Sequence, residues 1–351
     1  MKIGYLPSKL DISEPRDRRG FYWFVQEKKL KIEIADLNKK YDLIYVVCNG
    51  NNLSKLLEYK KQFPKTKLIL DIVDAYLEDR NFINIFFRGI IKFILRKEKK
   101  LYFSYTKLLK NFITECYAVI CATELQKKTL LKFNKNVKVS LDYMEVDFRR
   151  RSKDISLKKN SLDIFWEGKI YSLKHLKIFN KLSEKLKKKI HFHILTNLKV
   201  EVIPNMYYLK AKSISNAFNF NFTIHPWTKE NVYKVSDFCD IGIIPLNMRD
   251  KVAFNKCENK LILMWILGLP VITTATPAYC KAMKNLSNQR LCSNLIDWEN
   301  NLTKFLESSE IEIKNDLFEI EQKLYNEYSK KRYLDDWVSI FETLNIQLPL
   351  K

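Results

Sequence analysis

The chain has 351 residues, of which 46% are hydrophobic, so it is long enough and apolar enough for two domains with cores of their own. Its formal net charge of +22 favours anionic partners, and a solubilising lysine-rich surface is the alternative explanation. The low counts of 7 Gly and 9 Pro exclude long flexible linkers, and 7 cysteines without a CxxC motif indicate reduced thiols in a cytoplasmic protein. No apolar run in the sequence reaches the ~18–20 residues of a membrane-spanning helix.

Short apolar stretches alternate with longer helical patterns along the whole chain. The strand candidates are 2–6, 42–48, 67–73 and 118–122 in the first half, and 163–168, 191–195, 221–225, 241–246 and 269–275 in the second. Nearly continuous apolar strands separated by helices are typical of parallel sheets covered on both faces. Two successive sets therefore predict an α/β protein with two Rossmann-like, doubly wound domains.

The polar stretch 149–161 is the best domain boundary, because it carries charge without an apolar period. We therefore predict an N-terminal domain over 1–155 and a second domain over 156–315. The remaining segment, 316–351, has apolar residues at helical spacing, so it should form a helical segment that packs on a finished surface. Either half can supply that surface, and the prediction is that the segment packs back on the N-terminal domain.

In open α/β sheets, ligands lie beyond the carboxyl ends of the strands, so the residues that follow each predicted strand are candidates for a site. After the first strand, Arg16, Arg18 and Arg19 can meet a phosphate, or they form a solvated basic loop. After the second strand, Asn49 and Gly50 can receive a sugar hydroxyl, because glycine allows close backbone approach. An ordinary strand-to-helix turn explains that pair equally well.

Two carboxylates, Asp71 and Asp74, come at the end of the third strand. They are acidic candidates for a site, and a plain helix N-cap is the alternative. After the fourth strand, Thr123 and Glu124 have the pattern of a capping arrangement at a helix start, which is a structural role.

The segment 81–111 joins an apolar run to a strongly basic one. A short helix of this kind suits the surface of an anionic membrane leaflet. A buried helix of the first domain with basic flanks is the competing interpretation.

In the second half, the stretch DIFWEGKIYSLKHL (163–176) ends a predicted strand at Gly168, and Lys169 and Lys174 follow it. Two cations beside a helix N-terminus suit a diphosphate. Lysines that open an ordinary solvated helix are the alternative.

The stretch KCENKLILMWILGLPVIT (256–273) contains an evenly apolar run, which predicts a buried helix ended by Gly268. The start of such a helix offers amide groups and lysines to an anion. The residues at that start are Lys256, Glu258, Asn259 and Lys260.

The order Gly-Lys, a lysine five residues later, IGIIPL and then K-x-x-N-K…GLPVI resembles the C-terminal half of family 4 glycosyltransferases. These are retaining, metal-independent enzymes of the GT-B fold, in which two Rossmann-like domains face each other across a cleft. The resemblance implies a nucleotide sugar as donor, no cofactor and no metal, with Lys169 and Lys174 on the donor diphosphate. Pro245 falls on the proline that ends a strand of the family, and we count it among the donor-binding residues. The residues that match one branch of the family in register are Lys256, Asn259, Lys260, Gly268, Pro270 and Val271.

Two further positions follow from the resemblance. Trp227 lies in a turn that is near the nucleotide base in the family, where it can stack on the base or pack under a loop. Asp74 falls on the aspartate of a Thr-x-His-Asp strand end, with Val73 in place of the histidine, which makes Asp74 the acidic candidate for catalysis.

The sequence departs from the family at two acids. Many members carry two glutamates separated by seven residues, and the second usually holds the ribose hydroxyls. These positions are Asn255 and Leu263 here, while Glu258, which we keep among the donor-side candidates, is out of register.

Together these features predict a glycosyltransferase that moves a hexosyl or related sugar from a nucleotide sugar to a glycan or lipid-linked acceptor, in bacterial-type surface polysaccharide (lipopolysaccharide) synthesis. We expect a cytoplasmic protein, in peripheral contact with the membrane through 81–111, and no nucleic-acid partner. The alternatives are a nucleotide-sugar epimerase of the same fold and a catalytically silent protein that binds glycans or anions. The catalytic candidates are Asp74, Lys169 and Lys174, and the acceptor-side candidates are Arg16, Arg19, Asn49, Gly50 and Asp71.

Overall fold

The computed structural model divides the chain into two compact units, each built on a six-stranded parallel sheet. Unit 1 comprises Met1–Glu145, Asn255–Cys257 and Lys330–Lys351, and unit 2 comprises Val146–Phe254 and Glu258–Ser329. The structure describes residues 1–9, 11–12, 14–48, 52–72, 75, 77, 90, 101–102, 104–144, 161–203 and 207–348. Several predictions lie outside the described residues: Asn49, Gly50, Asp74, the boundary at 155 and most of the segment 81–111.

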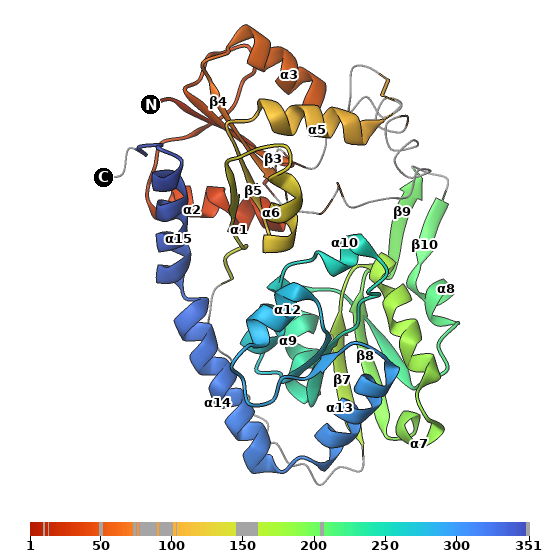
Figure 1. Cartoon of the computed structure of the whole chain (residues 1–351). Coiled ribbons are helices and arrows are strands. Elements are labelled where there is room, and N and C mark those ends of the chain that lie inside the picture. The colour runs from red at the N-terminus through yellow and green to blue at the C-terminus, as the bar shows by residue number, and fades with distance from the viewer. Residues whose placement is uncertain are drawn as a thin grey trace. The chain divides into compact units, whose positions relative to one another are not determined.

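Unit 1 has the strand order β2-β1-β3-β4-β5-β6, and Figure 1 labels its strands β3, β4 and β5. Its strands are β1 (Ile3–Leu6), β2 (Glu33–Ile34), β3 (Leu43–Cys48), β4 (Lys67–Ile72), β5 (Ala118–Cys121) and β6 (Val137–Val139). Its helices are α1 (Pro15–Arg19), α2 (Phe21–Glu27), α3 (Leu53–Gln62), α5 (Tyr105–Glu115), α6 (Glu124–Leu130) and α15 (Lys330–Thr343). Thr123 caps α6 by accepting a hydrogen bond from the Gln126 amide at 3.1 Å, which confirms its predicted structural role.

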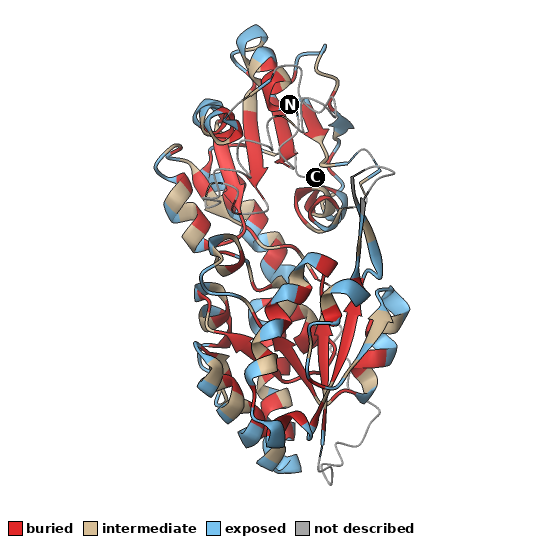
Figure 2. Cartoon of the chain, turned by 90° about the vertical axis from the view of Figure 1, so that its right-hand side faces the viewer, coloured by how far each residue is buried: buried red, intermediate tan, exposed pale blue. Residues whose placement is uncertain are grey.

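All six residues of β3 are buried, because helices cover both faces of the sheet (Figure 2). On one face, alternate residues of β3 share a core with Leu56 of α3 and Phe112 of α5. On the other face, the intervening residues share a core with Phe24 of α2 and Trp337 of α15. The apolar run of this strand therefore follows from cover on both sides.

The last helix, α15, completes the second face of the unit 1 sheet. Trp337 is fully buried, with its ring centroid 5.8 Å from that of Phe21 and 6.1 Å from that of Tyr45. Tyr117, which directly precedes β5, donates a hydrogen bond to the carbonyl of Leu344 at 2.6 Å. The C-terminal segment is divided between the units, since α15 belongs to unit 1 and α14 (Glu310–Glu327) to unit 2.

Unit 2 has the strand order β11-β8-β7-β12-β13-β14 and a separate antiparallel pair of β9 and β10. Its strands are β7 (Leu162–Glu167), β8 (Ile190–Thr196), β9 (Lys199–Ile203), β10 (Tyr207–Lys210), β11 (Phe222–Pro226), β12 (Ile241–Ile244), β13 (Val271–Thr274) and β14 (Leu291–Cys292). Its helices are the 3-10 helix η2 (Ile170–Lys181), α7 (Glu184–Lys187), α8 (Ala211–Ser215), α9 (Lys229–Phe238), α10 (Lys251–Phe254), α11 (Asn259–Ile266), α12 (Pro277–Met283), α13 (Leu295–Glu307) and α14.

The helix α11 is buried, as its apolar run predicts. Leu261, Met264 and Trp265 have no exposed surface. A side chain at Gly242 of β12 would place its Cβ 2.7 Å from Met264 Sδ, so glycine lets this helix lie close to the sheet. Gly268 follows the helix with φ of 70°, a left-handed conformation that favours glycine, and the chain re-enters the sheet as β13.

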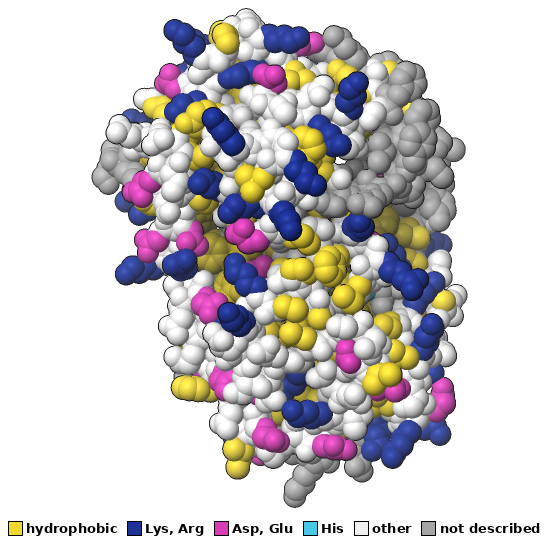
Figure 3. Space-filling model, viewed as in Figure 1, with side chains coloured by type: hydrophobic (Ala, Val, Ile, Leu, Met, Phe, Trp, Pro, Cys, Tyr) yellow, Lys and Arg dark blue, Asp and Glu magenta, His cyan; other side chains and the backbone are white. Residues whose placement is uncertain are grey.

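The chain carries 62 Lys and Arg residues. Figure 3 shows Lys and Arg side chains spread over one face and interspersed with acidic and hydrophobic side chains. Among the helices in the described ranges, none combines the length and hydropathy that crossing a bilayer requires.

Candidate functional site

The carboxyl end of β7 holds a cluster of polar side chains around Glu167. Trp227, which follows β11, donates its indole N–H to Glu167 Oε2 at 3.1 Å. Lys260, in the first turn of α11, donates to the backbone carbonyl of Glu167 at 2.6 Å, and its Nζ lies 3.6 Å from Glu167 Oε1. The end of β7, the end of β11 and the start of α11 thus meet at Glu167. They lie at the edge of the sheet where ligands bind in open α/β folds.

Gly168 belongs to the same cluster. A Cβ at this position would lie 3.0 Å from Lys260 Nζ and 2.9 Å from the ring of Trp166. The missing side chain therefore allows Lys260 to reach the strand end, where its Nζ also lies 5.2 Å from the ring centroid of Trp166. Of the predicted donor-binding residues, the structure brings together Gly168, Trp227 and Lys260.

Trp227 is anchored and exposed at once. Its indole N–H is held by Glu167, yet 46% of its surface is accessible. A tryptophan that only packs under a loop would be buried, so the second of the two predicted environments is wrong. An exposed ring with a fixed edge is suited to stacking on a planar ligand.

Lys169 and Lys174 both have exposed side chains on the chain that leaves β7. Lys174 Nζ lies 3.2 Å from Asp250 Oδ2, and the other carboxylate oxygen of Asp250 accepts a hydrogen bond from the Ala253 amide at the start of α10. Burial favours the protonated form of Asp250, but the hydrogen bonds from Ala253 and Lys174 lower its pKa overall. The predicted second cation is therefore held by an ionised carboxylate.

The predicted residues before and within α11 are in different environments. Lys256 is exposed and belongs to unit 1, whereas Glu258, Asn259 and Lys260 belong to unit 2. Glu258 is only 5% exposed, and burial raises the pKa of its carboxyl group. The structure therefore presents Lys260 at the strand ends and keeps Glu258 in the protein interior.

The loop after β12 begins with Pro245, which is buried. Its next residue, Leu246, donates its amide to Thr274 Oγ1 at the end of β13 at 2.8 Å. The amide of Asn247 donates to His175 Nδ1 of η2 at 3.2 Å. These hydrogen bonds fix the loop that carries Asp250. Pro245 is buried at the start of this loop, so its position in the structure is that of a residue that supports the loop.

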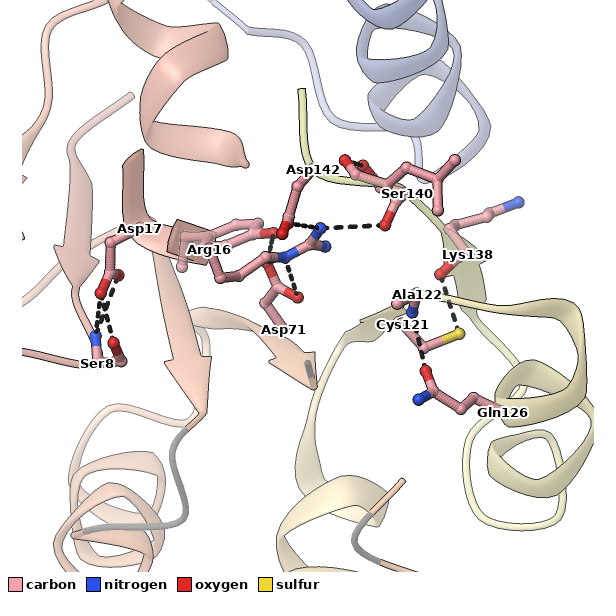
Figure 4. A network of polar contacts seen from close by, with 12 residues as sticks. Ser8, Arg16, Asp17, Asp71, Cys121, Ala122, Gln126, Lys138, Ser140 and Asp142 are labelled. Carbon is pink, nitrogen blue, oxygen red and sulfur yellow. Dashed lines mark hydrogen bonds and ion pairs between the residues drawn. The ribbon is translucent and has the colours of Figure 1, made fainter. Parts of the chain in front are cut away.

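In unit 1, the predicted residues Arg16 and Asp71 meet each other in a buried network (Figure 4). Arg16 Nε donates to both carboxylate oxygens of Asp71 at 3.0 and 2.8 Å, and its Nη1 donates to Asp142 Oδ1 at 2.8 Å. Tyr45 of β3 donates to Asp71 Oδ2 at 2.7 Å. Burial alone would lower the pKa of Arg16, but the two carboxylates raise it well above its ordinary value.

This arrangement differs from the predicted phosphate contact, because the charge of Arg16 is already balanced by two acids. Arg16 instead ties α1 to the end of β4 and to the segment after β6. The start of the same helix is held by Asp17, which accepts hydrogen bonds from the Tyr5 hydroxyl at 2.7 Å and from the Ser8 amide at 3.0 Å. Arg19 is partly exposed, and its carbonyl accepts from the Tyr143 amide at 2.8 Å.

Three acids of these networks, Glu167, Asp250 and Asp142, were not among the predicted site residues. Glu167 closes the strand of the DIFWEG motif and Asp142 follows β6, so each had the signal of an acid at a strand end. Asp250 precedes a short helix and had the signal of an N-cap. In the parts of the chain that the structure describes, no group of three His, Cys, Asp or Glu side chains is placed to hold a metal ion.

No protein-family model and no curated protein match the sequence. Solved structures do: a variant of TarM from S. aureus in complex with fondaparinux, α-GlcNAc-glycerol and UDP has a TM-score of 0.59 at 12% identity, over 91% of this chain and 57% of the TarM chain. HepE from Anabaena in complex with UDP has a TM-score of 0.62 at 12% identity, over 98% of this chain and 100% of HepE. A glycosyltransferase from Rickettsia africae ESF-5 has a TM-score of 0.58 at 12% identity, over 98% of each chain.

These likenesses and the two parallel six-stranded sheets confirm the predicted fold class, which is the GT-B fold with two Rossmann-like units. The chain spans little more than half of the length of TarM, at 57%.

Replacing Arg16 should destabilise unit 1 strongly. In Arg16→Met, Asp71 and Asp142 lose their shared buried cation, and removal of one partner from a buried ion pair costs ~3–5 kcal/mol. Urea unfolding followed by circular dichroism measures the change. Arg18→Met, at an exposed position of the same helix, is the control. Equal effects of the two substitutions would contradict a structural role for Arg16.

Replacing Glu258 by Gln should stabilise unit 2 at neutral pH. Because the folded-state pKa of Glu258 is raised above 4.5, ionisation of this buried carboxyl costs stability as the pH rises through that pKa. We expect Glu258→Gln to raise the Tm at pH 7, and in a domain of this size each ~1 kcal/mol of stabilisation corresponds to a rise of about 2–4 °C. The gain should disappear below about pH 4.5, where the wild-type carboxyl is protonated in both states. Glu310→Gln, at an exposed position, should show no such gain.

Proposed function

We propose that this protein is a glycosyltransferase that uses a nucleotide sugar, with the donor bound at the carboxyl ends of β7 and β12 in unit 2. The observation that carries the proposal is the cluster at Glu167. There the exposed Trp227 and Lys260 both donate hydrogen bonds to Glu167 at the end of β7. Support also comes from the fold, since TarM and HepE, which share it, are solved with UDP bound.

In the proposed donor complex, the ring of Trp227 stacks on the nucleobase. The diphosphate meets Lys169 and Lys174, whose exposed side chains follow Gly168. The Lys174–Asp250 pair is partly exposed, and such pairs contribute ~0–1 kcal/mol, so a phosphate can replace Asp250 as the partner of Lys174 at little cost.

The proposed chemistry is transfer of the sugar as the nucleoside diphosphate departs. Negative charge grows on the leaving diphosphate, and lysines fixed beside it stabilise that charge in the transition state. Transfer with retention of configuration and without a metal or a cofactor is part of the proposal. The acceptor in this proposal is a glycan or lipid-linked sugar bound by unit 1, and Asp74 is the acidic candidate for catalysis.

A thermal-shift panel of UDP, GDP, ADP and CMP sugars tests donor binding. A ligand present at about a hundred times its Kd stabilises the folded state by ~2.7 kcal/mol, so a true donor should raise the Tm by several degrees. UDP sugars are the first class to test. Trp227→Ala should reduce the shift, and Tyr171→Ala, at another exposed aromatic residue, should not. A panel in which no nucleotide sugar raises the Tm would overturn the proposal.

Turnover tests the role of the two lysines. Lys169→Ala and Lys174→Ala should each lower turnover more than about tenfold, because each removes a charge that acts on the leaving group. Lys177→Ala, at an exposed position of the same 3-10 helix, should leave turnover unchanged. Addition of a chelator should also have no effect. Unchanged turnover in both lysine variants would remove the assignment.

A catalytically silent binding protein is the second candidate. The observation in its favour is that Asn255 and Leu263 occupy the positions of the two acids that many family 4 enzymes carry. Calorimetric titration distinguishes the candidates, because a silent protein would bind a glycan without binding a nucleotide or consuming a donor.

A further inference from the structure

The helix α14 presents an apolar stripe on the side that faces away from the core of unit 2. Ile313 and Ile320 are buried against that unit. On the opposite side of the helix, Ile311 is 71% exposed, Phe318 is 62% exposed and Tyr325 is 47% exposed. Three large apolar side chains in one line are unusual on a solvated helix, where scattered single residues are the norm.

The stripe has the spacing of a coiled-coil interface. We use the name α14 seam for Ile311, Asn315, Phe318, Gln322 and Tyr325, all of which are exposed. Their separations are four, three, four and three residues, which is the alternation of d and a positions in a heptad. The seam contains no charged residue, although charges lie on both of its flanks.

The charge of the helix excludes an anionic surface as its partner. In the sequence EIEIKNDLFEIEQKLYNE, α14 has six acidic and two basic residues, in a chain whose net charge is +22. An anionic membrane leaflet or a nucleic acid would be repelled from this helix. A protein surface with a matching seam is the partner that the charges permit.

We propose that the α14 seam is the interface between two copies of this chain, paired in parallel about a two-fold axis. Parallel pairing in register places each seam residue against its own copy, as an isologous interface requires. The amides of Asn315 and Gln322 then meet amides at the a layers, while apolar side chains meet at the d layers. An antiparallel pairing would set these amides against apolar side chains.

The flanking charges agree with the parallel arrangement. With Ile311 at d, Lys314 takes a g position and Glu319 takes the following e position. Within one chain, Lys314 Nζ lies 2.5 Å from Glu310 Oε1, and Glu319 accepts hydrogen bonds from Ser287. In a parallel pair the g and e positions face each other, so Lys314 can exchange Glu310 for Glu319 of the partner subunit at little cost, and symmetry repeats the contact. The helix is 18 residues long, or ~27 Å, which gives a short seam and a dimer that dissociates on dilution.

Sedimentation velocity over a wide range of protein concentration tests the dimer. The wild-type chain should pass from monomer to dimer as concentration rises. Phe318→Glu should weaken the dimer at least about tenfold, because it buries two carboxylates at the centre of the seam. Ile296→Glu, at a residue of α13 that is 67% exposed and off the seam, should dimerise like the wild type. A monomer at every concentration, or a dimer unaffected by Phe318→Glu, would overturn the proposal.

The orientation is tested by a charge swap and a cross-link. Lys314→Glu and Glu319→Lys should each weaken the dimer, and the double variant should restore it. Asn315→Cys should form a disulfide-linked dimer on a non-reducing gel, and the wild-type chain should not. Failure of both tests would overturn the parallel pairing. Phe318-dependent binding to zwitterionic vesicles without dimerisation would assign the seam to a lipid surface instead.

Discussion

A parallel sheet in an α/β domain must be covered by helices on both faces, and the sheet of unit 1 is covered by helices that are far apart in the chain. One face receives α3 and α5, which connect its own strands. The other receives α2 and also α15, whose Trp337 packs among Phe21, Phe24 and Tyr45. Without α15, the aromatic side chains of this face would lie against water, and burial of apolar surface is the main favourable term in folding. The network at Arg16 depends on this core as well, because Tyr45, which donates a hydrogen bond to Asp71, is one of its buried residues.

The strands were predictable because their environment leaves a strong local signal. Every residue of β3 is buried, so the strand appears in the sequence as a continuous apolar run. The end of α11 was predictable for a similar reason, since a left-handed turn at Gly268 favours one residue type. The division of the C-terminal segment was not predictable, because α14 and α15 share one helical period and the sequence does not say which sheet each helix will cover.

The cationic residues of the candidate site were predictable from the sequence, but the acidic residues that bind them were not. Lysines near a strand end are visible in the sequence, but the carboxylates that hold them come from distant positions. Arg16 bonds to Asp71 at a separation of 55 residues and to Asp142 at a separation of 126. Lys174 bonds to Asp250 at a separation of 76. No local sequence pattern encodes such pairs. A buried arginine that binds carboxylates and an exposed arginine that binds a phosphate therefore look alike in the sequence until the sheet order is known.

Unit 1 is assembled from both ends of the chain, with unit 2 contained between Val146 and Ser329 apart from a short excursion. On the ribosome, the N-terminal sheet therefore emerges with one aromatic face covered by α2 but not by α15, and this face stays incomplete while all of unit 2 is synthesised. Apolar surface left exposed in this way favours aggregation, and the addition of α15 covers it. Loss of α15 would consequently damage the part of the protein that was made first.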